Sequence, residues 1–165
     1  MKIKPKIFKI KKLSDKRGSF SKLLSSIQNQ KIFKKEKIRE INFSFNNKKG
    51  TVRGFHYQTG KFREIKLVYC LSGQILDVIV NINKKSKDYK KIYKFNLDER
   101  KKEFLMIPKN YAHGFQTLKD NTILLYLHSS KYNKKFERRI NPIKNDLNFN
   151  WPKIISNISK KDSEN

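Results

Sequence analysis

Short segments in which apolar and polar residues alternate make up most of this chain, and turn residues separate them. Residues 37–45 alternate cleanly, and the Asn-Asn-Lys-Lys-Gly run at 46–50 is typical of a hairpin turn. A period of two residues indicates strands with one buried face. We therefore expect strands over residues 7–13, 37–45, 51–58, 65–71, 75–82, 90–97, 103–107, 112–118 and 122–128.

Helical spacing is confined to residues 21–30, which follow a turn at Asp15–Gly18 and form the one predicted helix. From Lys131 onward the pattern is irregular, with Trp151 and Pro152 as a predicted packing anchor. The last residues, 159–165, have the composition of a solvated tail. We find no repeat and no linker, so the chain is predicted to be a single domain over 1–165. Many short strands with little helix favour an all-β sandwich or barrel.

Composition sets limits on the partners of this chain. Its 165 residues include 36% apolar and 12% aromatic residues, which excludes a fully disordered polycation. The net charge is +26, but only seven of the 40 basic residues are arginines, and the lysines are spread along the whole length. Proteins that read nucleic acid usually cluster their charge and use arginine. Lysine together with frequent Asn and Ile is what an A+T-rich coding bias produces, so no specific nucleic-acid partner is expected.

The single cysteine, Cys70, excludes an internal disulfide framework and is expected to be a buried apolar residue. The N-terminus alternates Lys with Ile and Phe, so it lacks the apolar core of a signal peptide. The longest apolar stretch, residues 65–82, contains Lys66, Asp77 and further polar residues, which excludes a membrane-spanning helix. We expect a cytoplasmic protein without membrane association.

Three histidines are the first candidates for chemistry: His56, His113 and His128. His56 lies in the middle of a predicted strand. Simple alternation puts Gly54, His56 and Gln58 on one face of that strand, and Arg53, Phe55 and Tyr57 on the other. Taken alone, a histidine in such a position is more often a structural residue than a catalyst.

A set of separated motifs is more informative than any single residue. RGFHYQ at 53–58, IKLVYCLSGQILDVIVNI at 65–82, IPKNYAHGFQTL at 107–118 and a tyrosine at 126 occur in an order and spacing that resembles the dTDP-4-dehydrorhamnose 3,5-epimerase family. The resemblance runs from residues 15–18 to 159–162. It implies a cupin-type double-stranded β-helix (a jelly roll) with little helix, usually a homodimer, acting without a cofactor on nucleotide-linked 4-keto-6-deoxy sugars.

No metal site is expected. His113 follows a proline-led turn, as in the second metal motif of cupins. The first such motif needs two histidines separated by one residue, whereas His56 is followed by Tyr57 and Gln58. Half of the ligand set is therefore missing.

The resemblance assigns four catalytic residues. A C4 ketone acidifies the hydrogens on C3 and C5, so epimerisation needs a base, a group that stabilises the enolate oxygen and an acid on the opposite face. By their match to the family motifs, His56 is the expected base, Asp162 its carboxylate partner, Lys66 the cation near the oxyanion and Tyr126 the acid. Two alternatives remain open from the residues alone: Asp162 in a solvated tail, and Tyr126 as a packed strand residue.

The resemblance also implies substrate contacts. Arg17 and Arg53 match residues that hold the diphosphate or sugar, which suits their bidentate geometry. His113 is expected beside the sugar, with Asp77 orienting it. Tyr132 is expected to stack on the base. Asn42, Glu137 and Lys161 match further ligand contacts. In the family the N-terminal segment can complete the neighbouring subunit's site, so Arg17 is expected to act in trans.

Some positions depart from the family pattern, chiefly at the nucleoside end. Lys22 replaces a usual Glu, Ser19 a common aromatic and Glu40 a usual Gln, while Asn81 and Asn83 replace an Asp and an Arg. The hypothesis is epimerisation at C3, C5 or both of a dTDP-linked sugar. Alternatives are a single-position epimerase for a GDP- or CDP-linked sugar, a non-catalytic sugar-nucleotide-binding cupin, and a basic β-barrel that binds nucleic acid.

Overall fold

The computed structural model describes residues 3–23, 25 and 36–164, and almost all of its regular structure is β-strand. The all-β prediction is confirmed. The strands are β1 (Lys6–Lys9), β2 (Lys12–Asp15), β3 (Gly18–Ser21), β4 (Glu40–Asn46), β5 (Val52–Gln58), β6 (Lys66–Ser72), β7 (Gln74–Asn81), β8 (Ile92–Asp98), β9 (Glu103–Ile107), β10 (Tyr111–Thr117), β11 (Thr122–His128) and β12 (Glu137–Arg139). The described helices are the 3₁₀ turn η2 (Gly60–Phe62) and α2 (Lys160–Ser163).

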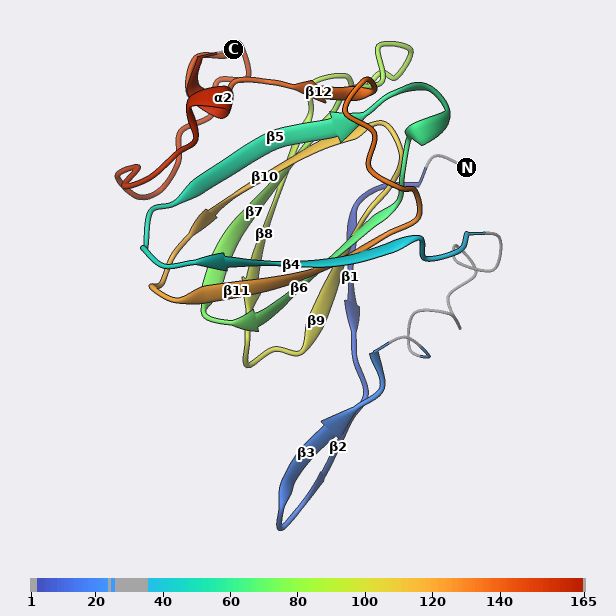
Figure 1. Ribbon diagram of the computed structural model, residues 1–165, viewed down its shortest axis with the longest axis vertical. Coiled ribbons are helices and arrows are strands. Elements are labelled where there is room, and N and C mark those ends of the chain that lie inside the picture. Colours follow the sequence, from blue (N-terminus) through green and yellow to red (C-terminus); the bar gives the residue numbers. More distant parts are fainter. Residues whose placement is uncertain (1–2, 24, 26–35, 165) are drawn as a thin grey trace.

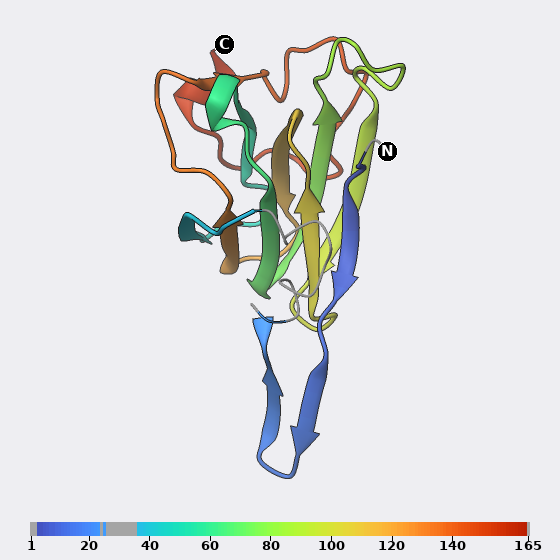
Figure 2. The ribbon, with the colours of Figure 1, turned by 90° about the vertical axis from the view of Figure 1, so that its right-hand side faces the viewer.

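Two five-stranded sheets face each other (Figures 1 and 2). The first sheet has the order β1-β9-β6-β11-β4, and the second has the order β12-β5-β10-β7-β8. All the neighbouring strands in both sheets are antiparallel. Segments distant in sequence therefore become neighbours, with β11 between β6 and β4, and β10 between β5 and β7.

The predicted strand over 7–13 is wrong as a single element. The chain leaves the first sheet after β1. At this point Ile10 is buried, and its backbone N–H donates to the Lys102 carbonyl. β2 and β3 then form a separate hairpin that projects from the body of the molecule (Figures 1 and 2). The predicted helix over 21–30 starts at the last residue of β3, and most of it lies outside the described residues.

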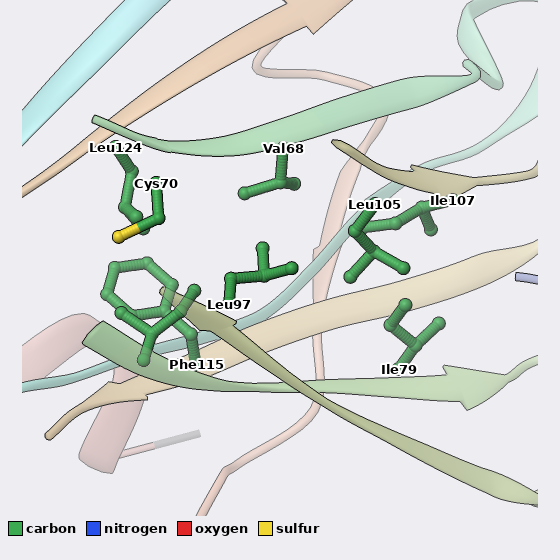
Figure 3. Close-up of a cluster of buried hydrophobic side chains, with 9 residues drawn as sticks. Val68, Cys70, Ile79, Leu97, Leu105, Ile107, Phe115 and Leu124 are labelled. Carbon is green, nitrogen blue, oxygen red and sulfur yellow. The ribbon is translucent and has the colours of Figure 1, made fainter. Parts of the chain in front are cut away.

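The main core lies between the two sheets (Figure 3). Alternate residues of the facing strands supply it: Val68, Cys70, Ile75, Ile79, Leu97, Leu105, Ile107, Phe115 and Leu124. Each is at most 2% exposed. Burying a side chain of this kind stabilises the fold by about 1.5–3 kcal/mol, so the alternation seen in the sequence also fixes which face of each strand turns inward. The prediction that Cys70 is buried is confirmed.

A second cluster lies under the C-terminal segment. Phe55 is fully buried there, and the Trp151 ring stacks on it with 5.7 Å between centroids. The Trp151 indole N–H donates to the Pro142 carbonyl at 2.9 Å. The predicted anchor at Trp151 is confirmed.

The expectation of a solvated tail is wrong for Asp162, although most residues around it in 159–164 are exposed. The Ser156 N–H bonds to the Gly50 carbonyl, and the Asn157 carbonyl accepts from Val52 N–H at 2.9 Å. These bonds lead the chain to α2, which lies beside β5 (Figure 1). Asp162 in α2 is only 4% exposed. Composition alone could not reveal that the start of β5 offers unpaired backbone groups to this segment.

A register shift in β5 corrects the predicted strand faces. Opposite β10, His113 pairs with His56 and Phe115 pairs with Arg53, so three steps on β5 match two on β10. An extra residue of this kind reverses the alternation beyond it. Gly54 lies at the shift with φ +119°. A Cβ atom on this residue would clash with the Gly114 Cα, so no larger residue fits here. Arg53 is therefore on the same side as His56, not on the opposite face.

Among the helices of the described residues, none is long and apolar enough to cross a membrane.

Candidate active site

Strand register gathers polar side chains on the inner face of the first sheet. Lys66 of β6, His128 of β11 and Glu40 of β4 are direct cross-strand partners in one row. Tyr126 lies two residues before His128 on the same face, and Asn42 of β4 is opposite Tyr126. Four of these five, all except Tyr126, line a cavity of about 190 Å³.

The second sheet supplies the facing wall of this cavity. His56 and Gln58 of β5 line it, together with Glu137 of β12, which is the cross-strand partner of Gln58. The Gln58 side chain is fixed by the Lys131 carbonyl and by the Asn133 N–H, at 3.2 and 2.7 Å. This wall is therefore held by strand pairing and by the loop that leads to β12.

His56 and Asp162 form a close pair. His56 Nε2 is 2.7 Å from Asp162 Oδ1, while Oδ2 accepts from the Gly54 N–H at 3.4 Å. Burial alone would raise the pKa of Asp162, but the bonds from His56 and Gly54 lower it overall. The carboxylate is thus ionised and can only accept, so the hydrogen lies on Nε2. The other ring nitrogen, Nδ1, is left with the lone pair that a base needs.

His113 has a carboxylate partner of its own. Its Nε2 is 3.0 Å from Asp77 Oδ2, and both side chains are almost fully buried. Burial lowers the pKa of His113, with smaller contributions from Lys66 and His56, against the opposing effect of Asp77. His113 is therefore a neutral residue behind the cavity wall, beside His56, and is not among the residues that line the 190 Å³ cavity.

Tyr126 does not line this cavity, and its ring lies near His128 of its own strand and His113 of the second sheet. Its ring centroid is 6.1 Å from that of His128 and 6.4 Å from that of His113. Its phenol oxygen is 3.3 Å from Ser44 Oγ. Burial raises the pKa of Tyr126 well above its ordinary value, while Ser44 and the charge of Arg53 oppose that rise.

Lys66 lies beside an unforeseen pair. Glu64 is 3.7 Å from the Lys66 ammonium and accepts from His128 Nδ1 at 2.8 Å. Burial would raise the pKa of Glu64, but Lys66 and His128 lower it overall. Lys66 is therefore a largely buried cation with one carboxylate neighbour, facing the cavity that His56 lines.

The rim of the cavity is built around Tyr132. Its backbone N–H donates to Glu40 at 2.9 Å, and its hydroxyl donates to Glu137 at 3.2 Å. Arg139 donates to the same Glu137 oxygen at 2.9 Å. The Tyr132 side chain itself is 57% exposed, so its ring is available at the mouth of the cavity.

Of the eight predicted substrate contacts, only Asn42, Tyr132 and Glu137 line this cavity, whereas Arg17, Arg53, Asp77, His113 and Lys161 do not. Arg17 lies in the projecting hairpin and is paired with Asp15 at 2.7 Å. Lys161, in α2, accepts from Arg139 through its carbonyl at 3.5 Å but does not line the cavity. Arg53 is exposed and bonds to Asn46 at 2.8 Å, at the Tyr126 end of the site.

Sequence reasoning missed several residues of the site. Those outside the predicted set are Ser44, Asn46, Gln58, Glu64 and Arg139; His128 was named as a candidate histidine but given no role, and Glu40 was noted only as a departure. Alternation along β11 could have found His128, because it is two residues from Tyr126. Alternation also puts Gln58 on the face of His56, and Ser44 and Asn46 on the face of Asn42, whereas Glu64 and Arg139 depend on contacts that local sequence does not specify.

The arrangement is suited to moving a proton. One wall carries an imidazole oriented by a carboxylate, and the other carries an ammonium group with a phenol beyond it. Within residues 3–23, 25 and 36–164, no group of three or more His, Cys, Asp or Glu side chains is placed to hold a metal ion.

Comparison with known proteins identifies the family to which this chain is similar. A family model described as dTDP-4-dehydrorhamnose 3,5-epimerase matches residues 4–165. The dTDP-4-dehydrorhamnose 3,5-epimerase of Shigella flexneri is 36% identical over 160 residues, which are 94% of this chain and 86% of the relative. The enzyme of that name from Bacillus anthracis, solved with TDP and PPi bound, superposes with a TM-score of 0.86 at 29% identity, over 96% of this chain and 90% of that one. The dTDP-6-deoxy-D-glucose-3,5-epimerase of Legionella pneumophila, in complex with dTDP-4-keto-L-rhamnose, gives 0.87 at 29% identity, over 96% and 84%.

Proposed function

The chain belongs to the dTDP-4-dehydrorhamnose 3,5-epimerase family, and we propose that it inverts C3 and C5 of dTDP-4-dehydro-6-deoxyglucose in deoxysugar biosynthesis. The cupin jelly roll expected from the sequence agrees with the superposition on solved members of that family. One observation carries the proposal: the His56–Asp162 pair and Lys66 face each other across one cavity from opposite sheets.

The first step is removal of a proton next to the ketone. His56 Nδ1 takes the hydrogen from C3 or C5, and the electron pair of the broken C–H bond forms the C=C bond of an enolate. Asp162, ionised and bonded to Nε2, holds the ring in the required tautomer and favours the imidazolium that forms. A general base of this kind contributes about 10²–10⁴-fold to the rate.

The second requirement is stabilisation of negative charge on the C4 oxygen. Lys66 is the cation on the facing wall, and its burial strengthens its interaction with an oxyanion. Tyr126 then gives its hydroxyl proton to the carbon from the side opposite His56, and the enolate returns to the ketone with inverted configuration. The phenolate regains a proton and the imidazolium loses one, so the enzyme is unchanged.

The nucleotide lies outside the small cavity in this proposal. A volume of about 190 Å³ is below the roughly 300–1,000 Å³ of common ligand pockets, so it suits the sugar ring alone. The exposed Tyr132 ring at the mouth is available for stacking on the base, next to Asn42 and Glu137. Arg53 and Arg17 are proposed to hold the diphosphate, and Lys161 to add a contact from α2.

A homodimer is proposed to complete the site. The outer face of β4 exposes Ile41, Phe43 and Phe45, each about 60% accessible, which is an unusual apolar stripe for a monomer. The hairpin of β2 and β3 projects from the body of the molecule (Figure 2), and Arg17 does not line the cavity of its own chain, so Arg17 would reach a site in a second copy. Mixing Arg17→Ala with His56→Ala protein tests this: subunit exchange restores activity only if Arg17 acts in trans.

Solvent exchange tests the reaction itself. The protein is incubated with dTDP-4-dehydro-6-deoxyglucose in D₂O, and C3 and C5 are followed by NMR and mass spectrometry. Two deuterons with inversion are expected, and His56→Ala should abolish both while binding of dTDP survives. Ser86→Ala, which removes a buried hydroxyl bonded to Asn81 and Asp88 outside the cavity lining, serves as the control and should retain exchange at both carbons.

Other outcomes select other functions. One deuteron would indicate a single-position epimerase. Tight dTDP binding with no exchange would indicate a binding protein, and exchange only with a GDP- or CDP-linked sugar would reassign the nucleotide. Affinity for nucleic acid that is lost completely at moderate salt would reflect only the charge of +26.

A further inference from the structure

A chain of hydrogen bonds connects Arg53 to Tyr126 through two residues of β4. Arg53 Nε is 2.8 Å from Asn46 Oδ1, Asn46 Nδ2 is 3.2 Å from Ser44 Oγ, and Ser44 Oγ is 3.3 Å from the Tyr126 hydroxyl. The chain thus spans β5, β4 and β11, and it joins the two sheets.

The chemistry of the groups fixes the direction of this chain. A guanidinium can only donate, so the atom of Asn46 that faces Arg53 must be the amide oxygen. The amide nitrogen of Asn46 also donates to the Thr122 carbonyl at 3.1 Å, which can only accept. Asn46 therefore donates to Ser44, and the Ser44 hydroxyl keeps its own hydrogen for the oxygen of Tyr126.

Neither Ser44 nor Asn46 has the surroundings of an ordinary surface or core residue. Asn46 is 3% exposed, and a buried amide costs stability unless its hydrogen bonds are made. Ser44 is half-buried on the inner face of β4, whereas the outer face of the same strand carries Phe43 and Phe45. Polar residues are thus placed only on the side that faces Tyr126.

We propose that Ser44 and Asn46 are positioning residues that prepare Tyr126 to act as the acid, Asn46 orienting the Ser44 hydroxyl so that it donates to the phenol oxygen. This rests on the proposed function. When the Tyr126 O–H bond breaks and its proton forms the new C–H bond, the Ser44 hydrogen stabilises the phenolate left behind. With its oxygen accepting from Ser44, the phenol hydrogen is free to point at the substrate.

The electrostatic surroundings make this support necessary. The titratable and charged groups around Tyr126 are Arg53 on β5, Cys70 on β6, Asp77 on β7, His113 on β10 and His128 on β11. Burial and Asp77 both raise the pKa of Tyr126, which weakens it as an acid, while the Ser44 bond and the Arg53 charge lower it. A hydrogen bond to a group that becomes charged is also stronger than a neutral one.

The test compares the rate at which deuterium enters C3 and C5 with the rate at which these carbons are inverted. In Ser44→Ala, His56 still removes the proton, so deuterium still enters C3 and C5, but delivery from the opposite face slows. We expect inversion to fall about 10–100-fold, the range for one bond to a charged group, with exchange that retains configuration rising relative to inversion. The alkaline limb of the pH–rate profile should move to higher pH, and KM should change less than about twofold.

Two further variants separate positioning from packing. Ser44→Thr keeps the hydroxyl and should recover most of the inversion rate. Asn46→Asp keeps an acceptor for Arg53 but cannot donate to Ser44, so it should resemble Ser44→Ala. Ser86→Ala is the matched control, because it removes another buried hydroxyl, bonded to Asn81 and Asp88, remote from Tyr126.

The result that overturns this inference is an unchanged ratio of inversion to exchange in Ser44→Ala, or an equal loss in Ser44→Thr and Ser44→Ala. Absence of any exchange in the unmodified protein would instead contradict the proposed function, so the two failures are distinguishable.

Discussion

Replacing Asp162 by asparagine tests the link between the C-terminal segment and the proposed base. The two carboxylate oxygens of Asp162 accept from His56 Nε2–H and from the Gly54 N–H. An amide of the same size has one acceptor and one donor. If its oxygen meets His56, its NH₂ faces the Gly54 N–H; if it turns over, it donates to Nε2 and forces the hydrogen of His56 onto Nδ1.

Either orientation weakens the proposed base, and the second removes its lone pair from the substrate side. Wrong-tautomer changes of this kind reduce kcat by about 10²–10⁴-fold in enzymes with an oriented histidine. Loss of one charge-assisted bond costs less than about 3 kcal/mol of unfolding free energy. A domain of this size is stable by about 5–15 kcal/mol, so the variant should remain folded.

Deuterium exchange at C3 and C5 is the assay, with dTDP binding and thermal unfolding as controls. Exchange in Asp162→Asn at the rate of the unmodified protein would refute the assigned role of the pair. Acid titration gives a second check. The pKa of Asp162 is lowered in the fold, so its contribution to stability is present above its ordinary pKa and lost as pH falls through the folded value. The difference in stability between the two proteins should therefore narrow below about pH 4.

The remaining predictions concern stability and accessibility. Phe55→Ala should lower the free energy of unfolding by about 3–5 kcal/mol and the Tm by about 10 °C or more, because the fully buried ring stacks on Trp151; a change within 2 °C would contradict that packing. Burial lowers the pKa of His113, so stability should be full above about pH 6.5 and fall as the pH drops further. The free energy of unfolding of His113→Gln should depend less steeply on pH over that range. An equal pH dependence would exclude His113 as the cause. Burial raises the pKa of the Cys70 thiol to about 12, so native protein should resist iodoacetamide at pH 8 and react only when unfolded; rapid alkylation of the native state would show that the core opens.

The fold class could be predicted from local sequence, and much of the candidate site from the resemblance of its motifs to a known family. Alternation along segments such as 65–71 and 122–128 identifies strands, because the faces of a strand repeat every two residues. The motif around His56, together with Lys66 and Tyr126, predicts proton-transfer chemistry. In the structure these three residues lie on the two facing sheets. Alternation is a property of neighbouring residues and can be seen without knowing how the chain folds, whereas the roles of His56, Lys66 and Tyr126 are implied by the resemblance to the family.

What only the tertiary structure decided concerns register and docking. The shift at Gly54 moves Arg53 to the His56 side, and nothing in the alternation of β5 signals it. Pairing of β11 with β6 and β4 sets His128 between Lys66 and Glu40. Asp162 reaches His56 only because residues 156–157 bond to the start of β5. Each depends on contacts between segments far apart in the chain, and such contacts are set by the packing of the whole molecule, not by the residues beside them.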